Sequence, residues 1–226
     1  MRCTYKNVRI NIAYCNYKPT FSTKMLADSI EIMGNPVVCD VGTGCGVLAL
    51  LASKLGAKKV FAIDIDRKSG ICVQKNSKAN KIENVEFLQG SIFMPLKDKV
   101  DIIVANLPQT PSNKKIDMHR NGSLDGTKNI MGLLRTAPKK LKKRGFVLFT
   151  LFSLSNPSRI FNYLRKHYNF KVISVAERKF VKKKYESLSK GLSSYIIGMA
   201  KKGKAMFFCR DNELYYLVYV VKAIPK

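Results

Sequence analysis

A glycine-rich turn that directly follows a short apolar run constrains this chain more than any other feature. The run at residues 37–41 leads into Asp40-Val41-Gly42-Thr43-Gly44-Cys45-Gly46, and residues 47–55 continue as an apolar segment with helical period. Glycine has no Cβ, so a ligand can approach the backbone of such a turn closely. A strand, a glycine turn and a helix in this order predict an α/β protein whose first strand leads to a ligand site.

Apolar runs and helical periods alternate along the rest of the chain. Strands are predicted at residues 37–41, 60–64, 85–88, 100–105, 146–152, 170–176 and 214–221. Helices are predicted at residues 22–33, 47–55, 67–80, 126–143, 156–167 and 185–199. This alternation predicts a doubly wound α/β fold: a mostly parallel, seven-stranded Rossmann-like sheet whose last strand is antiparallel. We expect one domain over residues 1–226, with a strand/helix extension at 1–35 and a basic insertion at 178–205.

Composition excludes several classes of protein. Apolar residues make up 46% of the sequence, which is typical of a folded protein, yet no apolar run is long enough to span a bilayer. The N-terminus lacks the apolar segment of a signal peptide, so we expect a cytoplasmic protein without membrane contact. Six cysteines without a C-x-x-C pair and only two histidines predict no metal site. The oligomeric state is not indicated.

Charge is the unusual part of the composition. Lys and Arg number 41 against 15 Asp and Glu, which gives a net charge of +26. A field of this sign favours nucleic acid, ribosomes or other anionic partners. A lysine-rich genome would produce the same excess, and both interpretations stay open.

The spacing of the glycines separates two kinds of ligand. A dinucleotide-binding turn, G-x-G-x-x-G, would require glycine where Val47 stands. The pattern here is D-x-G-x-G-x-G, with an acid placed to meet a ligand that carries an ammonium or sulfonium group. The candidate ligand contacts in the turn are Asp40, Gly42, Thr43, Gly44 and Gly46.

Two later strand ends add to this site. The second strand ends in Asp64, whose carboxylate can accept hydrogen bonds from both hydroxyls of a ribose. The third strand is followed by Gly90-Ser91-Ile92, and an adenine could lie between Ile65 and Ile92. Asp64, Ile65, Ser91 and Ile92 are therefore further candidate ligand contacts.

The glycine turn, Asp64 and the stretch after the third strand follow one another in the order that is typical of the class I S-adenosylmethionine-dependent methyltransferases. Residues 38–106, which contain these motifs, resemble that class, and the resemblance extends over residues 19–176. It implies an enzyme with S-adenosyl-L-methionine as its cofactor. Residues 19–28 are similar to the P-x-x-x-T-x-x-L-x-D segment of the HemK-type glutamine methyltransferases. In that family the threonine lies beside the methionine part of the cofactor, which makes Thr23 a candidate contact. Asn121-Gly122 and Asp125-Gly126 also resemble a glycine-rich stretch of the same family.

The fourth strand ends in Asn106-Leu107-Pro108-Gln109, which resembles the N-P-P-Y motif of methyltransferases that act on planar nitrogen. Such a nitrogen is a poor nucleophile because its lone pair is delocalised. The Asn106 side-chain oxygen and the Leu107 carbonyl could each accept one N–H, while Pro108 fixes the direction of that carbonyl. Asn106, Leu107 and Pro108 are the candidate catalytic residues, and Asn106 is also a candidate cofactor contact. Gln109, a candidate substrate contact, replaces an aromatic ring that stacks on planar substrates.

The resemblance implies N-methylation of a glutamine side-chain amide in a protein substrate, which could be ribosome-associated. The charge favours an alternative substrate, a base in rRNA or tRNA, and a non-catalytic nucleic-acid or ribosome-binding module is a third interpretation. The basic stretch at 178–205 carries the candidate substrate contacts Lys182, Lys183 and Lys184. Phe180, Tyr185 and Tyr195 are interleaved with these lysines, a pattern that can bind nucleic acid.

Overall fold

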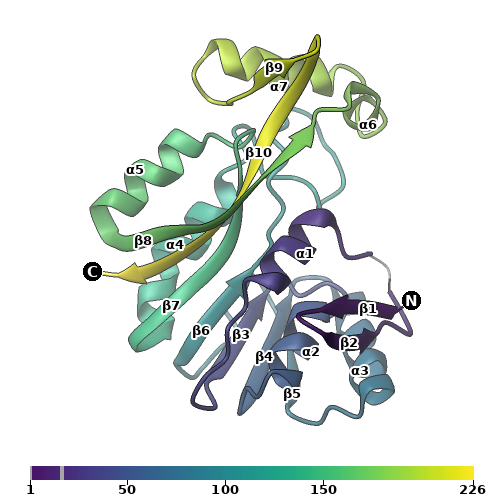
Figure 1. The fold of residues 1–226 in the computed structure, drawn as a ribbon, viewed down its shortest axis with the longest axis vertical. Helices are drawn as coiled ribbons and strands as arrows, with labels where there is room; N and C mark the ends of the chain where they lie inside the picture. Colours follow the sequence, from purple (N-terminus) through teal and green to yellow (C-terminus); the bar gives the residue numbers. More distant parts are fainter. Residues whose placement is uncertain (1, 16–17) are drawn as a thin grey trace. The chain divides into compact units, whose positions relative to one another are not determined.

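The computed structural model describes residues 2–15 and 18–226 (Figure 1). The described residues form two compact units. Unit 1 contains the residues up to Asn106, residues 136–149 and Pro225; unit 2 contains residues 107–135, 150–224 and Lys226. The expectation of a single domain stays a prediction.

The centre of unit 1 is a sheet whose strands follow the order β5-β4-β3-β6-β7, with every neighbouring pair parallel. The strands are β3 (Val37–Val41), β4 (Lys59–Asp64), β5 (Val85–Gln89), β6 (Val100–Ala105) and β7 (Leu141–Phe152). The helices between them are α2 (Val47–Lys54), α3 (Arg67–Asn80) and α4 (Lys128–Lys140), and α1 (Phe21–Asp28) precedes the sheet. The inner strands are buried on both faces, as parallel sheets require.

The order in which the chain adds strands to the sheet reverses at β3, its first strand. The chain moves outward from β3 to β4 and β5, then returns to the other side of β3 as β6 and β7. Because parallel crossovers are right-handed, α2 and α3, which connect the strands on one side of β3, pack on the same face of the sheet. The carboxyl ends of β3 and β6 therefore border the crevice in which doubly wound sheets bind their ligands.

A hairpin of β1 (Arg2–Tyr5) and β2 (Val8–Asn11) precedes α1 and was only partly predicted. Its turn uses Lys6 and Asn7, both with positive φ. β2 packs against α2 and α3, so the hairpin extends the helical layer of unit 1.

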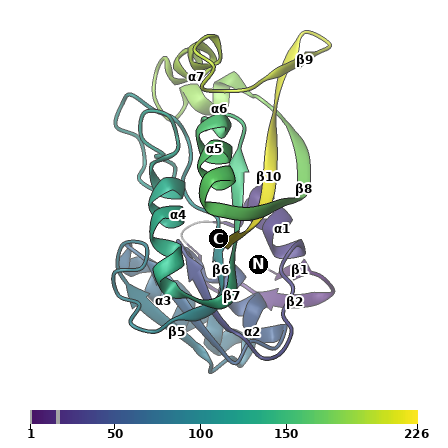
Figure 2. The same ribbon diagram turned by 90° about the vertical axis from the view of Figure 1, so that its left-hand side faces the viewer.

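Unit 2 contains residues 128–135 of α4, residues 150–152 of β7 and six further elements. They are α5 (Pro157–His167), β8 (Tyr168–Lys179), α6 (Lys182–Glu186), α7 (Leu192–Lys201), β9 (Phe208–Arg210) and β10 (Glu213–Pro225). β10 pairs with β9 antiparallel and runs in the opposite direction to its neighbour β8 (Figure 1). α5 packs along β8 (Figure 2). The predicted fold class is confirmed: the sheet is mixed and mostly parallel, and its last long strand is antiparallel.

Local signals set several boundaries where they were predicted. β3, α3 and β6 have the expected bounds, and α5 begins at Pro157 because Asn156 caps it by accepting the Arg159 N–H.

Three helix predictions were wrong in extent. The first helix ends at Asp28 instead of Met33, because the Ser29 hydroxyl bonds the Met25 carbonyl and competes with the backbone. α4 ends at Lys140, and residues 141–144 begin β7, where Lys142 pairs with Asp101. The helix expected at 185–199 is two helices, since Gly191 starts α7 with a left-handed φ of 81°.

Candidate functional site

The glycine turn joins β3 to α2 in a left-handed conformation. Gly42, Gly44 and Gly46 have φ values of 74°, 54° and 81°, which residues with a Cβ adopt only at a cost. A Cβ built on Gly44 would meet no atom within 4 Å, so this side of the turn is open. The turn is held by hydrogen bonds from the Gly42 and Thr43 N–H groups to the carbonyl of Ile63 on β4.

Asp40 lies beneath this turn and is almost completely buried. Its Oδ2 accepts hydrogen bonds from the Thr43 hydroxyl (2.6 Å) and the Ala49 N–H (3.1 Å). Among the described residues, none makes a hydrogen bond to its Oδ1. Burial raises the pKa of Asp40 to about 7, although these two hydrogen bonds act in the opposite direction. An unpartnered buried oxygen of this kind fits a cationic group such as the ammonium of an amino-acid ligand.

Asp64 ties the end of β4 to the glycine turn. Its Oδ2 accepts the Gly44 N–H at 2.9 Å, and its Oδ1 accepts the Asp66 N–H at 3.0 Å. Each carboxylate oxygen has a second lone pair, so these bonds leave capacity for two hydroxyl donors. The geometry fits the predicted contact with a ribose.

The residues predicted to hold an adenine border the same strand end. Ile65 follows Asp64 and is 54% exposed, which is unusual for a large apolar side chain. The loop after β5 is joined to this end by a hydrogen bond from the Gly90 N–H to the Asp64 carbonyl. Ser91 is exposed, and Ile92 has a φ of 51°. A β-branched residue rarely adopts this conformation, and such strain is typical of functional loops.

Thr23 and Asn106 meet at the end of β6. The Asn106 amide donates from Nδ2 to the Thr23 hydroxyl at 2.9 Å. Thr23 is the third residue of α1, where its hydroxyl also accepts the Thr20 N–H and completes a capping box. The end of α1 that carries Thr23 thus fixes the orientation of the Asn106 side chain.

Thus residues predicted as cofactor contacts cluster at adjacent strand ends of unit 1 and fit the parts of S-adenosylmethionine. Asp40 suits its ammonium, Asp64 its ribose, and the open side of Gly44 admits its backbone contacts. A family model of ribosomal protein L11 methyltransferases (PrmA) matches residues 21–154. The chain belongs to this family. The protein is a class I methyltransferase that uses S-adenosylmethionine, as predicted.

Relatives of the methyltransferase include a "putative protein N5-glutamine methyltransferase" of Methanocaldococcus jannaschii, 30% identical over 162 residues, which cover 69% of this chain and 81% of the relative. A ribosomal protein L11 methyltransferase of Alkaliphilus oremlandii is 33% identical over 132 residues. That match covers 55% of this chain but 42% of the relative, so the chain spans less than half of its length. The solved tRNA m1G37 methyltransferase of M. jannaschii shares the fold at 17% identity, with a TM-score of 0.59 over 100% of this chain and 56% of that one.

The rest of the methyltransferase's N-L-P-Q motif lies in unit 2. Gln109 is 2% exposed, and both ends of its amide are engaged. Its Nε2 donates to the Thr150 carbonyl at 2.9 Å, and its Oε1 accepts the Phe152 N–H at 3.1 Å. The prediction of a direct contact between Gln109 and substrate is therefore revised: the side chain anchors the loop to β7. Leu107 is also buried, and the carbonyl of Pro108 accepts a hydrogen bond from Asn129.

The glycines at 122 and 126 explain the stretch that resembles the HemK-type family. A Cβ on Gly122 would lie 2.7 Å from the Gln109 carbonyl carbon, and one on Gly126 would lie 2.5 Å from its oxygen. The Ser155 hydroxyl donates to the same oxygen at 2.7 Å. Asp125 holds the stretch by pairing with Arg159 at 2.8 Å. Burial would raise the pKa of Asp125, but hydrogen bonds from Thr127 and Arg159 outweigh it and hold the pKa at about 2.

The basic insertion differs from its predicted role in one respect. Lys182, Lys183 and Lys184 are exposed on α6. Phe180 and Tyr185 are buried and stack on each other with ring centroids 4.5 Å apart, so they are core residues and not platforms for bases. Tyr195 donates its hydroxyl proton to the Leu124 carbonyl at 2.8 Å.

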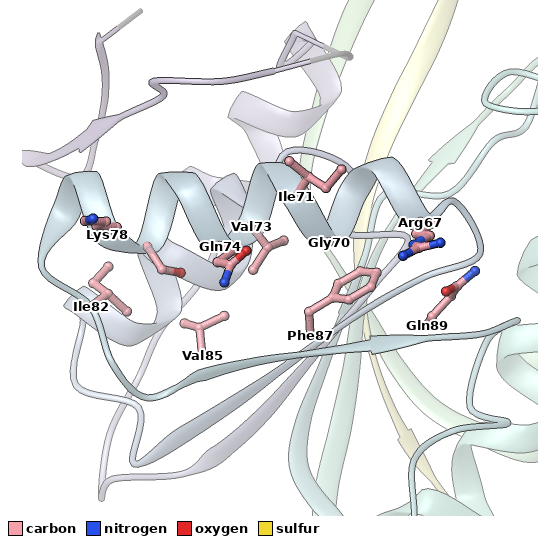
Figure 3. Close-up of a pocket in the computed structure, with 11 residues that line it drawn as sticks. Arg67, Gly70, Ile71, Val73, Gln74, Lys78, Ile82, Val85, Phe87 and Gln89 are labelled. Carbon is pink, nitrogen blue, oxygen red and sulfur yellow. The ribbon is translucent and has the colours of Figure 1, made fainter.

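Other features of the described residues lie outside the predicted site. A pocket of about 710 Å³ between α3 and β5 contains no predicted residue, and the Phe87 ring lies beneath Gly70 in its lining (Figure 3). The described part of the chain has no cluster of three or more metal-ligating side chains. No described helix is long and apolar enough to cross a bilayer. Sequence reasoning missed Asn129, Thr150 and Ser155, because only spatial proximity relates them to the motif.

Proposed function

We propose that this methyltransferase methylates the side-chain amide nitrogen of a glutamine in a protein substrate. The observation that carries the proposal is the hydrogen bond from the Asn106 amide to the Thr23 hydroxyl. Since Nδ2 is committed to Thr23, the orientation of the amide is fixed, and Oδ1 is the atom assigned to accept an N–H from the substrate. S-adenosylmethionine supplies an electrophilic methyl group, so the residues of the chain need only align the nitrogen.

The backbone after Asn106 provides the second acceptor. The Leu107 carbonyl receives one long contact, from Gln109 Nε2 at 3.4 Å, and a carbonyl oxygen has two lone pairs. Gln109 and Pro108 are anchored by Thr150 and Asn129, which holds the peptide of Leu107 in place. Two acceptors directed at one NH₂ group would concentrate its lone pair toward the methyl donor.

Position 109 favours an amide over a nucleobase. The side chain there is buried and bonded, so this position offers no ring on which a base could stack. The N5-glutamine methyltransferase name of the M. jannaschii relative supports the same substrate class, and the L11 methyltransferases also act on a protein.

Incubation with methyl-labelled S-adenosylmethionine and a cell extract tests the proposal. We expect label that is released by protease, resists nuclease, and appears as N5-methylglutamine after complete digestion. The Asn106→Ala variant controls for labelling by other enzymes. Label on lysine or on RNA in the parent reaction, absent with the variant, would contradict the glutamine assignment.

The alternative substrate, RNA, is favoured by the net charge of +26 and by the cations of unit 2. Lys184 is exposed as a residue, but its ammonium is partly desolvated and lies near Arg120 and Arg178, which together lower its pKa. If the lysines of α6 bind phosphates, changing Lys182, Lys183 and Lys184 to Gln should flatten the salt dependence of RNA binding. The matched control changes Lys139, Lys140, Lys142 and Lys143, and equal slopes for the two variants would remove the positional argument.

A further inference from the structure

Two asparagines on one face of α3 hold the N-terminal segment of unit 1. Asn80 and the backbone of Asn11 exchange two hydrogen bonds, at 2.8 and 2.7 Å. Asn76, one turn earlier, exchanges two with the backbone of Tyr14, at 3.0 and 2.8 Å. Residues four apart project from the same face of a helix, so the segment from 11 to 14 is fixed along α3.

Asn76 connects this segment to the cofactor turn. Its Nδ2 donates to the Cys45 carbonyl at 2.9 Å as well as to the Tyr14 carbonyl, and the side chain is fully buried. One nitrogen atom therefore lies between the carbonyls of residues 14 and 45. Cys45 stands between Gly44 and Gly46 in the turn that contacts the cofactor.

This arrangement brings two thiols into contact. The Cys45 thiol shares a hydrogen bond with the Cys15 thiol, and neither cysteine is part of a disulfide. Cys45 is buried whereas Cys15 is half-buried, so an oxidant reaches Cys15 first. Cys3 is a further half-buried thiol of unit 1, and its side chain is hydrogen-bonded to Tyr5.

We propose that Cys15 and Cys45 form a reversible disulfide that weakens binding of S-adenosylmethionine. A hydroperoxide is the oxidant. The Cys15 sulfur attacks the O–O bond and becomes a sulfenic acid, which releases one water when the oxidant is hydrogen peroxide. The Cys45 sulfur then attacks the Cys15 sulfur and displaces a second water. Two thiols and one peroxide thus give one disulfide and two waters.

Formation of the disulfide would move the backbone of the glycine turn, because the two sulfur atoms must come closer together. Its S–S bond is about 2.05 Å long, much shorter than the separation of hydrogen-bonded thiols. Asn76 restrains the backbone on both sides, so the left-handed glycines next to Cys45 take up the movement. Gly44, whose N–H holds Asp64, is displaced with them. Because linkage is reciprocal, bound S-adenosylmethionine should shift the thiol–disulfide equilibrium toward the two thiols.

The test uses the full chain, hydrogen peroxide and calorimetry with S-adenosylmethionine. Oxidation should reduce affinity by roughly tenfold or more, the effect of losing one charge-assisted hydrogen bond, and dithiothreitol should restore it. Peptide mapping should show Cys15 linked to Cys45. Cys15→Ser should keep its affinity after peroxide, whereas the matched variant at the exposed Cys209, Cys209→Ser, should lose affinity like the parent.

Three results would overturn the proposal. The first is a disulfide that joins Cys45 to Cys3 instead of Cys15. The second is an unchanged affinity for S-adenosylmethionine in protein that peptide mapping shows to carry the Cys15–Cys45 bond. The third is a loss of affinity after peroxide in Cys15→Ser that equals the loss in the parent protein. Far-ultraviolet circular dichroism of each oxidised sample identifies unfolding, and loss of affinity through unfolding alone also counts against the proposal.

Discussion

Two buried polar side chains of this methyltransferase, Asp40 and Gln109, have opposite hydrogen-bonding environments. Asp40 in unit 1 has one oxygen bonded twice and the other without a partner among the described residues. Gln109 in unit 2 has both ends of its amide bonded to β7. Unsatisfied buried groups are costly and mark places where a ligand completes the structure, whereas satisfied ones hold a backbone in position. The comparison separates a ligand-binding turn from a positioning loop.

Asn106 lies where these two regions meet in the sequence, and its loss should have the largest effect. Asn106→Ala should lower the single-turnover rate by about 100-fold or more, because alignment of the substrate nitrogen is lost. Affinity for S-adenosylmethionine should change far less, since Asp40 and Asp64 remain. Rapid-quench kinetics and calorimetry on the same preparation measure both quantities. A variant that loses affinity as much as rate would assign Asn106 to the cofactor turn instead.

Substitution of Asp64 should change the affinity for S-adenosylmethionine, because this residue belongs to the cofactor turn and not to the loop around Gln109. Asp64→Ala removes the acceptor of the Gly44 N–H and the proposed acceptor for the ribose, at a cost of about 1.5–3 kcal/mol. Calorimetry should show affinity weakened at least roughly tenfold. Asp66→Ala, which removes a carboxylate two residues away, is the control. Equal affinities for the two variants would show that only local charge matters.

Gly122 tests the positioning loop. A Cβ there would lie 2.7 Å from the Gln109 backbone, so Gly122→Ala should destabilise the protein by about 1–3 kcal/mol. Gly198→Ala is the matched control, since a Cβ at this position of α7 meets no atom within 4 Å. It should be neutral or stabilising by up to about 1 kcal/mol. Urea denaturation measures both, and similar values would mean that the glycine packing on Gln109 is unimportant.

Asp40 makes cofactor affinity depend on pH. Its pKa is raised to about 7 by burial, so unliganded protein holds the proton at pH 6. Only the ionised form pairs with an ammonium, so affinity should rise by roughly tenfold at most between pH 6 and pH 8. Stability without ligand has the opposite trend: it is highest below about pH 4 for this group and falls as pH rises to about 7. Asp40→Asn should remove both trends, and a pH profile unchanged in this variant would exclude Asp40 as the titrating group.

The contrast between the turn around Asp40 and the loop around Gln109 explains which parts of the site could be predicted from the sequence. The cofactor turn is local: the acid and glycines of residues 40–46 stand next to one another, so their order alone predicted a turn between a strand and a helix. Gln109 depends on Thr150, 41 residues away, and on Ser155, 46 residues away. No periodicity or cap signals such contacts, so the residue was predicted to face the substrate. The break between α6 and α7 was missed for a related reason, since Gly191 also fits inside a helical pattern.

The glycine packing around Gln109 also limits how this chain can evolve. A tyrosine at position 109 would not by itself provide a stacking ring, because the side chain there points toward β7 and Gly122 and Gly126 lie against its backbone. An outward-facing ring at position 109 would therefore require further changes where Gln109 is held, at Thr150 and in the glycine stretch. Substitutions at position 109 and in the glycine stretch share contacts, so we expect their effects on the free energy of unfolding to be non-additive.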